Sequence, residues 1–320
     1  MSSVSGGGIT VQFDVADGAR ITSLTAGGRE WLAPSGPRSP GVFVQPGSGG
    51  WDEVVPTVAA CTLADGTALA DHGDGWQAAW TLDSADAQHV QTSVGLPSLQ
   101  ISLTRRIEAT DTGIRLTYTA STDAAGPVPL AWCAHPLFVA DADTRLVAAA
   151  PEPRLIEEYP HRGRPRDWPG AVGDAAIKAF TDGARSSAAV VHANGDTLTL
   201  EWDPALLPYL GLYWDGGEFT ETPVVAIEPS TAFGDSAARA VAEGRIRMLE
   251  PGRPFRWWVK LTAWVDRDRA SLCGRMGTMT STPHTATTAR AAICIWPPIS
   301  RPVRRSEKSP SKTWCTGGSA

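Results

Sequence analysis

Residues 99–120 read LQISLTRRIEATDTGIRLTYTA, and this stretch decides the fold class. Apolar side chains occupy alternate positions on both sides of a polar turn; they are Leu99, Ile101 and Leu103, then Ile114, Leu116, Tyr118 and Ala120. A period of two is typical of a strand with one buried face, because successive side chains of a strand point to opposite faces. Asp111-Thr112-Gly113 supplies turn residues between the two runs. The stretch therefore predicts an antiparallel β-hairpin.

The same alternation recurs in other parts of the chain. Its apolar positions are Ile9, Val11, Phe13 and Val15, then Leu198, Leu200 and Trp202, and then Phe255, Trp257, Val259, Leu261 and Ala263. Only one short helix stands out, with Asp235 as its predicted N-cap, residues 236–243 as its body and Gly244 as its stop. Strands without long helices between them favour an all-β fold, so we expect one large antiparallel sandwich or barrel.

The composition limits the possible partners. The chain has 42% apolar residues and a net charge of −6, and no run of 18 apolar residues occurs that could cross a membrane. Nucleic acids and anionic lipid surfaces attract positively charged proteins. We therefore expect neither as a partner, and a small, neutral, polar ligand fits the charge better.

The cysteines and the first residues bear on location. The five cysteines are odd in number and have no C-x-x-C spacing; they are Cys61, Cys133, Cys273, Cys294 and Cys315. Residues 1–10 lack the basic and apolar regions of a secretory signal. We expect reduced thiols, no metal site and a cytoplasmic protein.

The charge changes sign near residue 266. Residues 1–265 have a charge balance of −12, whereas residues 266–320 have a balance of +6 and contain 15 serines and threonines. The second segment shows no sustained period of 2 or 3.6. The sequence therefore predicts a β-domain over residues 1–265 and a basic, Ser/Thr-rich, poorly ordered tail over residues 266–320.

His135 is the first candidate for chemistry. It is the only polar side chain in the apolar block LAWCAHPLF, residues 130–138, and Pro136 favours an extended backbone at the preceding residue. A buried imidazole needs a partner or a function. The alternative is a neutral core histidine with a satisfied hydrogen bond.

Glu228 is the second candidate, and a possible partner of His135. It ends the apolar segment VVAIE, residues 224–228, just before a proline. A buried carboxylate is costly unless it is used, and burial makes a carboxylate a better general base. The alternative is a carboxylate at a strand end that reaches solvent.

His72 and several tryptophans suggest how a ligand is held. His72 lies in the glycine-rich stretch DHGDGW, residues 71–76, where the alternative is an exposed loop histidine. Trp51 stands beside Asp52, and Trp214 beside Asp215. Flat rings next to hydrogen-bonding groups are suited to sugars, which have apolar faces and hydroxylated edges. Most of the thirteen tryptophans are still expected in the core.

Several segments of the sequence, taken together in their order along the chain, resemble the aldose 1-epimerase, or galactose mutarotase-like, family. The resemblance covers about residues 8–266; its pieces are GGWDEVVPT (49–57), DHG (71–73), WCAHPLF (132–138), LGLYW (210–214), AIEP (226–229), DS (235–236) and WWVKL (257–261). It implies a one-domain β-supersandwich. The neighbours of His135 depart from the asparagine- and aromatic-rich motif of characterised galactose mutarotases, so the chain resembles a divergent branch. The family's sugar-binding arginine has no clear counterpart in this sequence, since Arg38 sits in a Pro/Gly loop.

The resemblance implies a function and roles for residues. Glu228 is similar in position to the family's general base, His135 to its general acid and His72 to a sugar-binding histidine. We expect Trp51, Asp52, Trp214 and Asp215 to supply further sugar contacts. The implied reaction is the interconversion of α and β anomers by opening and closing the sugar ring, without cofactor or metal, by a monomer or homodimer.

Two alternatives belong to other classes of protein. The chain can be a carbohydrate-binding protein without turnover. It can also be a glycoside-cleaving enzyme on a similar sandwich, which needs two carboxyl groups on either side of one bond. In that case Glu228 would pair with Asp52 or Asp215.

Overall fold

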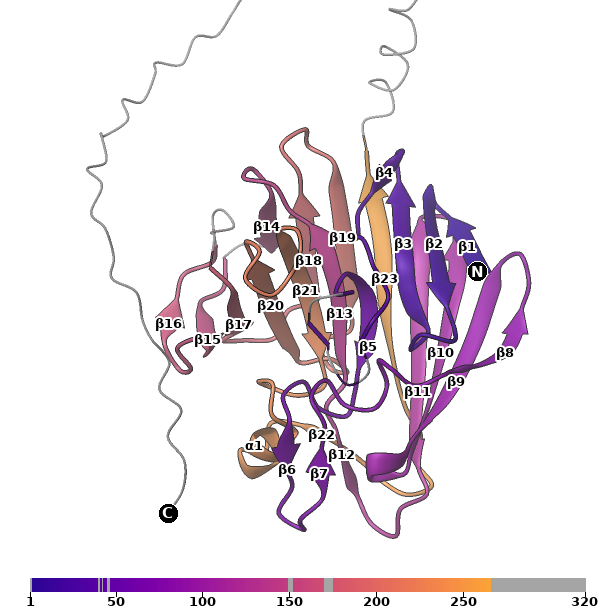
Figure 1. The fold of residues 1–320 in the computed structure, drawn as a ribbon, viewed down its shortest axis with the longest axis vertical. Helices are drawn as coiled ribbons and strands as arrows, with labels where there is room; N and C mark the ends of the chain where they lie inside the picture. Colours follow the sequence, from indigo (N-terminus) through magenta and orange to yellow (C-terminus); the bar gives the residue numbers. More distant parts are fainter. Residues whose placement is uncertain are drawn as a thin grey trace, which may run out of the picture. The chain divides into compact units, whose positions relative to one another are not determined.

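The computed structural model describes residues 2–39, 41, 43, 44, 47–148, 152–169 and 175–265. The predicted basic tail, residues 266–320, lies outside the described residues. Within the described part, no helix is both long enough and apolar enough to span a bilayer. The described chain forms two large antiparallel sheets and two small ones (Figure 1), so the all-β expectation is confirmed.

The larger sheet contains eleven strands. In spatial order they are β1 (Ser2–Gly6), β2 (Ile9–Asp14), β3 (Arg20–Ala26), β5 (Gly50–Val54), β13 (Cys133–Val139), β21 (Val224–Ser230), β20 (Tyr209–Asp215), β17 (Ile177–Thr181), β15 (Leu155–Tyr159) and β16 (Pro165–Arg166), with β4 (Arg29–Glu30) beside β3. Strands β21 and β17 are buried along their whole length. Both faces are covered there, and their sequences are therefore nearly continuous apolar runs.

The smaller of the two large sheets contains eight strands and the predicted hairpin. Its order is β14 (Arg145–Ala148), β18 (Ser187–Val191), β19 (Thr197–Trp202), β23 (Phe255–Trp264), β11 (Gly113–Thr122), β10 (Ile101–Thr110), β9 (His89–Leu96) and β8 (Thr81–Ala85). Strands β10 and β11 pair in register from Ile101 with Thr122 to Thr110 with Gly113. The hairpin is confirmed, and its alternate positions are buried.

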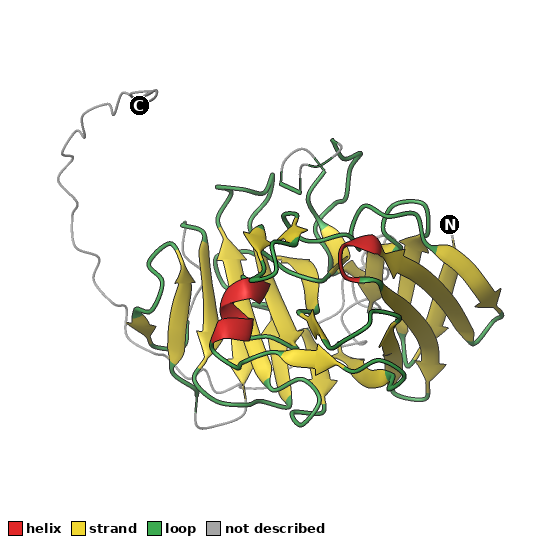
Figure 2. Cartoon of the chain, turned by 90° about the horizontal axis from the view of Figure 1, so that it is seen from below, coloured by secondary structure: helices red, strands yellow, loops and turns green. Residues whose placement is uncertain are grey.

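The remaining elements are short. They are β6 (Cys61–Thr62) with β7 (Ala68–Leu69), β12 (Val128–Leu130) with β22 (Arg247–Leu249), the 3₁₀ turn η1 (Pro97–Leu99) and the helix α1 (Ala237–Ala242). Figure 2 shows two short helical segments in red among the strands, which are η1 and α1, and α1 lies where the short helix was predicted. The N-cap of α1, however, is Ser236, whose hydroxyl accepts the Arg239 backbone N–H. The predicted cap was wrong by one residue, which leaves the Asp235 side chain available for another role.

A buried polar cluster around Glu53 of β5 links the two large sheets inside the apolar core. Its carboxylate accepts hydrogen bonds from Arg105 of β10 at 3.0 Å, from Tyr118 of β11 at 2.8 Å and from the Trp132 indole at 2.8 Å. A buried charge of this kind is tolerated only when it is paired and hydrogen-bonded. The cluster therefore fixes how the two sheets pack.

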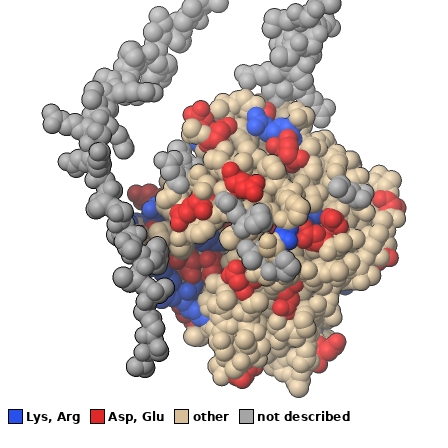
Figure 3. All heavy atoms as spheres, in the orientation of Figure 1, with Lys and Arg blue, Asp and Glu red and all other residues tan. Residues whose placement is uncertain are grey.

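Acidic side chains lie scattered over the face shown in Figure 3. Among the described residues on that face, basic side chains are few. The distribution follows from the negative charge balance of residues 1–265.

Candidate active site

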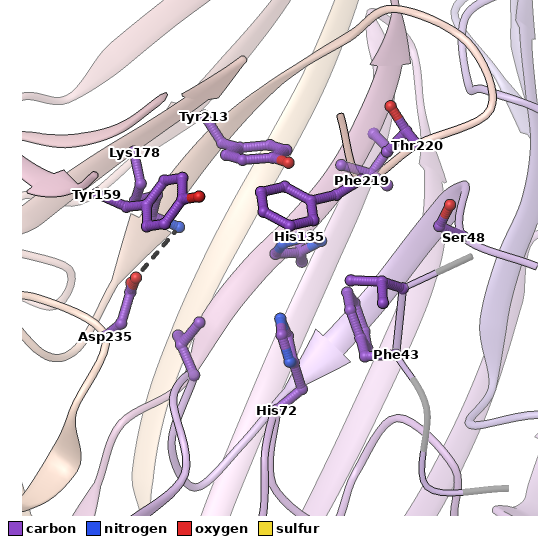
Figure 4. Close-up of a pocket in the computed structure, with 13 residues that line it drawn as sticks. Phe43, Ser48, His72, His135, Tyr159, Lys178, Tyr213, Phe219, Thr220 and Asp235 are labelled. Carbon is purple, nitrogen blue, oxygen red and sulfur yellow. Dashed lines mark ion pairs between the residues drawn. The ribbon is translucent and has the colours of Figure 1, made fainter. Parts of the chain in front are cut away.

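A cavity of about 230 Å³ opens on the larger sheet, on the face turned away from the main core. Figure 4 shows side chains from distant parts of the sequence converging on it. The lining residues are Phe43, Val44, Ser48, Val58, His72, His135, Leu137, Tyr159, Lys178, Tyr213, Phe219, Thr220 and Asp235. The cavity is thus lined by a few polar groups among aromatic and aliphatic side chains, which is typical of a small-molecule site.

His135 lines this cavity, whereas Glu228 is fully buried outside the lining and lies against two lining residues, His135 and Lys178. The register of β13 and β21 pairs Cys133 with Ser230 and Phe138 with Val225, which places His135 opposite Glu228 on the same face. His135 Nε2 lies 3.8 Å from Glu228 Oε1. The two candidates that the sequence placed 93 positions apart therefore form one pair.

The two oxygens of Glu228 have different surroundings. Oε2 accepts hydrogen bonds from Lys178 Nζ and from the Cys133 thiol, the latter at 3.3 Å. Oε1 has no hydrogen-bond partner among the described residues, although the side chain is fully buried. A buried acceptor without a partner is costly, so this atom is positioned for a donor that the free protein does not supply.

His135 is neutral near pH 7. Burial is the main cause that lowers the pKa of His135 well below 6.5, and the positive charge of Lys178 adds to it. Its Nδ1 has no hydrogen-bond partner among the described residues. The protonated imidazole is therefore scarce at neutral pH, and it gives up its proton readily.

Lys178 and Asp235 complete the polar side of the cavity. Burial opposes the charge on Lys178, but Glu228 and Asp235 outweigh it and raise the pKa of the amine, so Lys178 is a cation. Its Nζ lies 3.7 Å from Asp235 Oδ1 (dashed in Figure 4). Burial raises the pKa of Asp235, opposed by the charge of Lys178, and Oδ1 accepts no hydrogen bond within the described chain.

His72 lines the opposite side of the cavity. Its Nδ1 lies 2.8 Å from Asp71 Oδ2, and its ring stacks on Phe43 with centroids 3.6 Å apart. The ring meets that of His135 edge to face at 5.7 Å. The backbone of His72 has a φ of +56°, a left-handed conformation that non-glycine residues seldom adopt and that clusters at functional sites.

The structure places Trp51 and Asp52 outside the cavity lining. Trp51 is fully buried in the main core. Asp52 pairs with Arg38 and lies 3.9 Å from Arg20. Arg38 also donates to the Trp76 carbonyl at 2.9 Å. Both arginines are thus engaged with Asp52, and neither is among the described residues that line the cavity.

Trp214 and Asp215 also lie outside the lining. Trp214 is buried in the main core. Asp215 accepts the backbone N–H groups of Gly217, Glu218 and Phe219 at 2.6–2.9 Å and the Thr220 hydroxyl at 3.0 Å. Phe219 and Thr220 line the cavity, so Asp215 shapes the wall of the site through the loop that it holds.

Comparison with solved structures shows what the fold resembles. A candidate aldose 1-epimerase from Escherichia coli K12 is 17% identical over 82% of this chain and 98% of its own, with a TM-score of 0.67. A galactose mutarotase-related enzyme from Lactobacillus acidophilus is 13% identical over 82% and 97%, with a TM-score of 0.66. A galactose mutarotase-like protein from Lactobacillus casei is 17% identical over 82% and 100%, with a TM-score of 0.64.

The chain has the galactose mutarotase-like fold. No protein-family model matches the sequence, and no curated protein matches it. The predicted resemblance is therefore confirmed at the level of the fold, in a sequence that has diverged far from its structural neighbours.

Sequence reasoning missed several residues that line this cavity of the mutarotase-like fold. Lys178 is the clearest case, since it is the only ionisable residue of the buried strand β17. The same signal that pointed to His135 was present there: one charged residue in an apolar strand. Tyr213 and Phe43 carried no such signal, because aromatic residues in strands and loops are most often core residues.

Proposed function

We propose that the protein interconverts the α and β anomers of an aldose. The observation that carries the proposal is the pair of Glu228 and His135 beside a small cavity, with Glu228 Oε1 left without a hydrogen-bond partner among the described residues. The fold shared with galactose mutarotase-like proteins supports it. His72 lies at the same cavity, where the resemblance implies a sugar-binding histidine.

The reaction consists of two proton transfers. Glu228 Oε1 accepts the proton of the anomeric hydroxyl while protonated His135 gives a proton to the ring oxygen, and the bond from C1 to the ring oxygen breaks. The open-chain aldehyde then rotates about the C1–C2 bond. Reversal of both transfers closes the ring on the other face and returns each proton to its donor.

The distances in the free protein agree with these roles. At 3.8 Å, Glu228 Oε1 and His135 Nε2 are too far apart for a hydrogen bond with each other. A sugar oxygen near the pair can therefore bond to either group. Catalytic hydrogen bonds often tighten only when the substrate is bound.

A carbohydrate-binding protein is the second candidate. The observation that favours it is the complete burial of Glu228, because a carboxylate with no exposed surface has none with which to contact a sugar. A glycoside hydrolase is less well supported, because Asp52 pairs with arginines and Asp215 holds a loop. Asp235 and Glu228 are both paired with the ammonium of Lys178.

The test is proton NMR of anomer exchange across D-glucose, D-galactose, D-mannose and D-xylose. We expect the wild-type protein to accelerate exchange of at least one sugar above the spontaneous rate. Glu228→Gln should remove the acceleration while the sugar still binds, as seen by line broadening. Binding without acceleration in the wild type would support the second candidate instead.

A further inference from the structure

Lys178 reaches Glu228 across an intervening strand. Lys178 lies on β17 and Glu228 on β21, and β20 runs between them. The strand pairings place Gly211 of β20 directly beside Glu228 on one side and Phe180 on the other. A Cβ atom at Gly211 would lie 3.2 Å from Glu228 Oε2 and 3.3 Å from Lys178 Cε. Because Gly211 has no side chain, the Lys178 side chain can cross over β20 at this position and reach Glu228.

The contact with Lys178 gives the two oxygens of the Glu228 carboxylate different surroundings. Oε2 receives both Lys178 Nζ and the Cys133 thiol. Oε1 receives no hydrogen bond from the described residues and faces His135. Any proton that Glu228 accepts from a ligand must therefore go to Oε1, because both donors already occupy the other oxygen.

The charges around Glu228 come from several elements. The titratable groups around it are Cys133 and His135 on β13, Lys178 on β17, Tyr213 on β20 and Asp235 before α1, and His72 faces His135. His135 is neutral near pH 7, and Asp235 is a second acid beside the same ammonium. Among the described residues that line the cavity, Lys178 is the only lysine or arginine.

We infer that Lys178 is a positioning residue for Glu228: its ammonium keeps the buried carboxylate ionised and occupies Oε2, so that Oε1 alone is free to act as the base. The inference deepens the proposed function and rests on it for the identity of the proton that Oε1 accepts. The ionisation of Glu228 by Lys178 can be tested without any sugar. A carboxylate buried without a cation would take up a proton instead.

The first experiment is infrared spectroscopy of the sugar-free protein at pH 7. Subtracting the spectrum of Glu228→Gln isolates the Glu228 carboxyl group. We expect an ionised group in the wild type and in Lys178→Arg, and a protonated group in Lys178→Met. Lys260→Met is the matched control, since Lys260 forms a partly exposed pair with Glu201 at 3.8 Å.

This experiment decides the inference separately from the proposed function, because it needs no turnover. A protonated Glu228 in the wild type at pH 7 would overturn the inference, and that measurement holds even where Lys178→Met does not fold. An ionised Glu228 in folded Lys178→Met would overturn it too. The NMR exchange assay, by contrast, tests the proposed function and does not test whether Lys178 keeps Glu228 ionised.

The second experiment applies where the wild type accelerates exchange of one of the four aldoses. With that sugar, Lys178→Met should lower kcat at pH 7 by at least about tenfold and leave KM within a few-fold, whereas Lys178→Arg should restore most of the rate. The ratio of the Lys178→Met rate to the wild-type rate at the same pH should rise with pH as Glu228 of the variant ionises. A raised KM with unchanged kcat would overturn the positioning role, because it would make Lys178 a sugar-binding residue.

Discussion

His135 Nε2 and Glu228 Oε1 face each other at 3.8 Å on adjacent antiparallel strands, and each atom belongs to a buried side chain. The strand register fixes the pair, because His135 and Glu228 are cross-strand neighbours in the middle of the eleven-stranded sheet. Neither residue depends on a loop for its position. A rigid pair of this kind is suited to proton transfer, in which small displacements are costly.

The pair should behave as one catalytic unit. Glu228→Gln keeps the size of the side chain but removes the base, and His135→Asn removes the acid. Each should lower the rate of anomer exchange by about 10² or more. The double variant should be little slower than the slower single variant, because residues that act in one step are not additive. Polarimetry, corrected for the spontaneous reaction, measures all three.

A control distinguishes lost chemistry from lost binding. Sugar affinity should stay within a few-fold of wild type in both single variants. His72→Ala should instead weaken binding, because His72 lines the far side of the cavity. Wild-type rates in Glu228→Gln would exclude Glu228 as the base.

The pH dependence of activity should reflect the burial of His135. Burial and the charge of Lys178 lower the pKa of His135 well below 6.5. Since the acid must be protonated, kcat/KM should fall about tenfold per pH unit once the pH exceeds that value. The decline on the basic side should therefore begin below pH 6.5. A rate that stays constant above pH 7 would mean that another group supplies the proton.

The sequence was sufficient for the strands and for singling out His135 and Glu228, which the structure brings within 3.8 Å of each other. The alternation of residues 101–122 predicted the hairpin, and isolated ionisable residues in apolar runs predicted His135 and Glu228. Both signals are local, and a period of two reports directly on which face is buried. Lys178 gave the same signal, but its partner lies two strands away, and the order of strands in a sheet is not visible in the period.

The tryptophan positions show where local reasoning fails. Trp51 and Asp52 are neighbours in sequence, and both are buried, but successive side chains of a strand point to opposite faces. Asp52 pairs across the sheet with His135, so Trp51 points into the main core. The same alternation separates Trp214 from Asp215. In a strand, the residue next to a site residue therefore points to the opposite face of the sheet. Residues two positions apart point to the same face.

The stability of the protein should fall with pH below 6.5, and His192 should contribute. Burial, aided by Arg29, lowers the pKa of His192, which lies against Trp31 with ring centroids 5.0 Å apart. Below pH 6.5 the unfolded chain binds a proton that the folded protein does not. The free energy of unfolding should therefore decrease by up to about 1.4 kcal/mol per pH unit for this residue, until the pH passes the folded-state pKa.

Urea denaturation of wild type and His192→Gln between pH 5 and 8 measures the effect. The two proteins should differ by a constant free energy above pH 7.5, and the difference should shrink as the pH falls below 6.5. His192 lies outside the cavity lining, so anomer exchange at pH 7 should be retained. A difference that is independent of pH would refute the role of His192.

Arg105 and Arg106 should respond very differently to the same substitution. Arg105 is fully buried and donates to Glu53 at 3.0 Å and to the Ala19 carbonyl at 2.5 Å. Arg105→Met leaves the buried carboxylate without its cation, which should lower the free energy of unfolding by about 3–5 kcal/mol. Arg106 pairs with Glu108 at 3.0 Å at the surface, and Arg106→Met should cost about 0–1 kcal/mol. Urea denaturation of the two variants gives both values, and similar losses would show that the Glu53 cluster does not hold the sheets together.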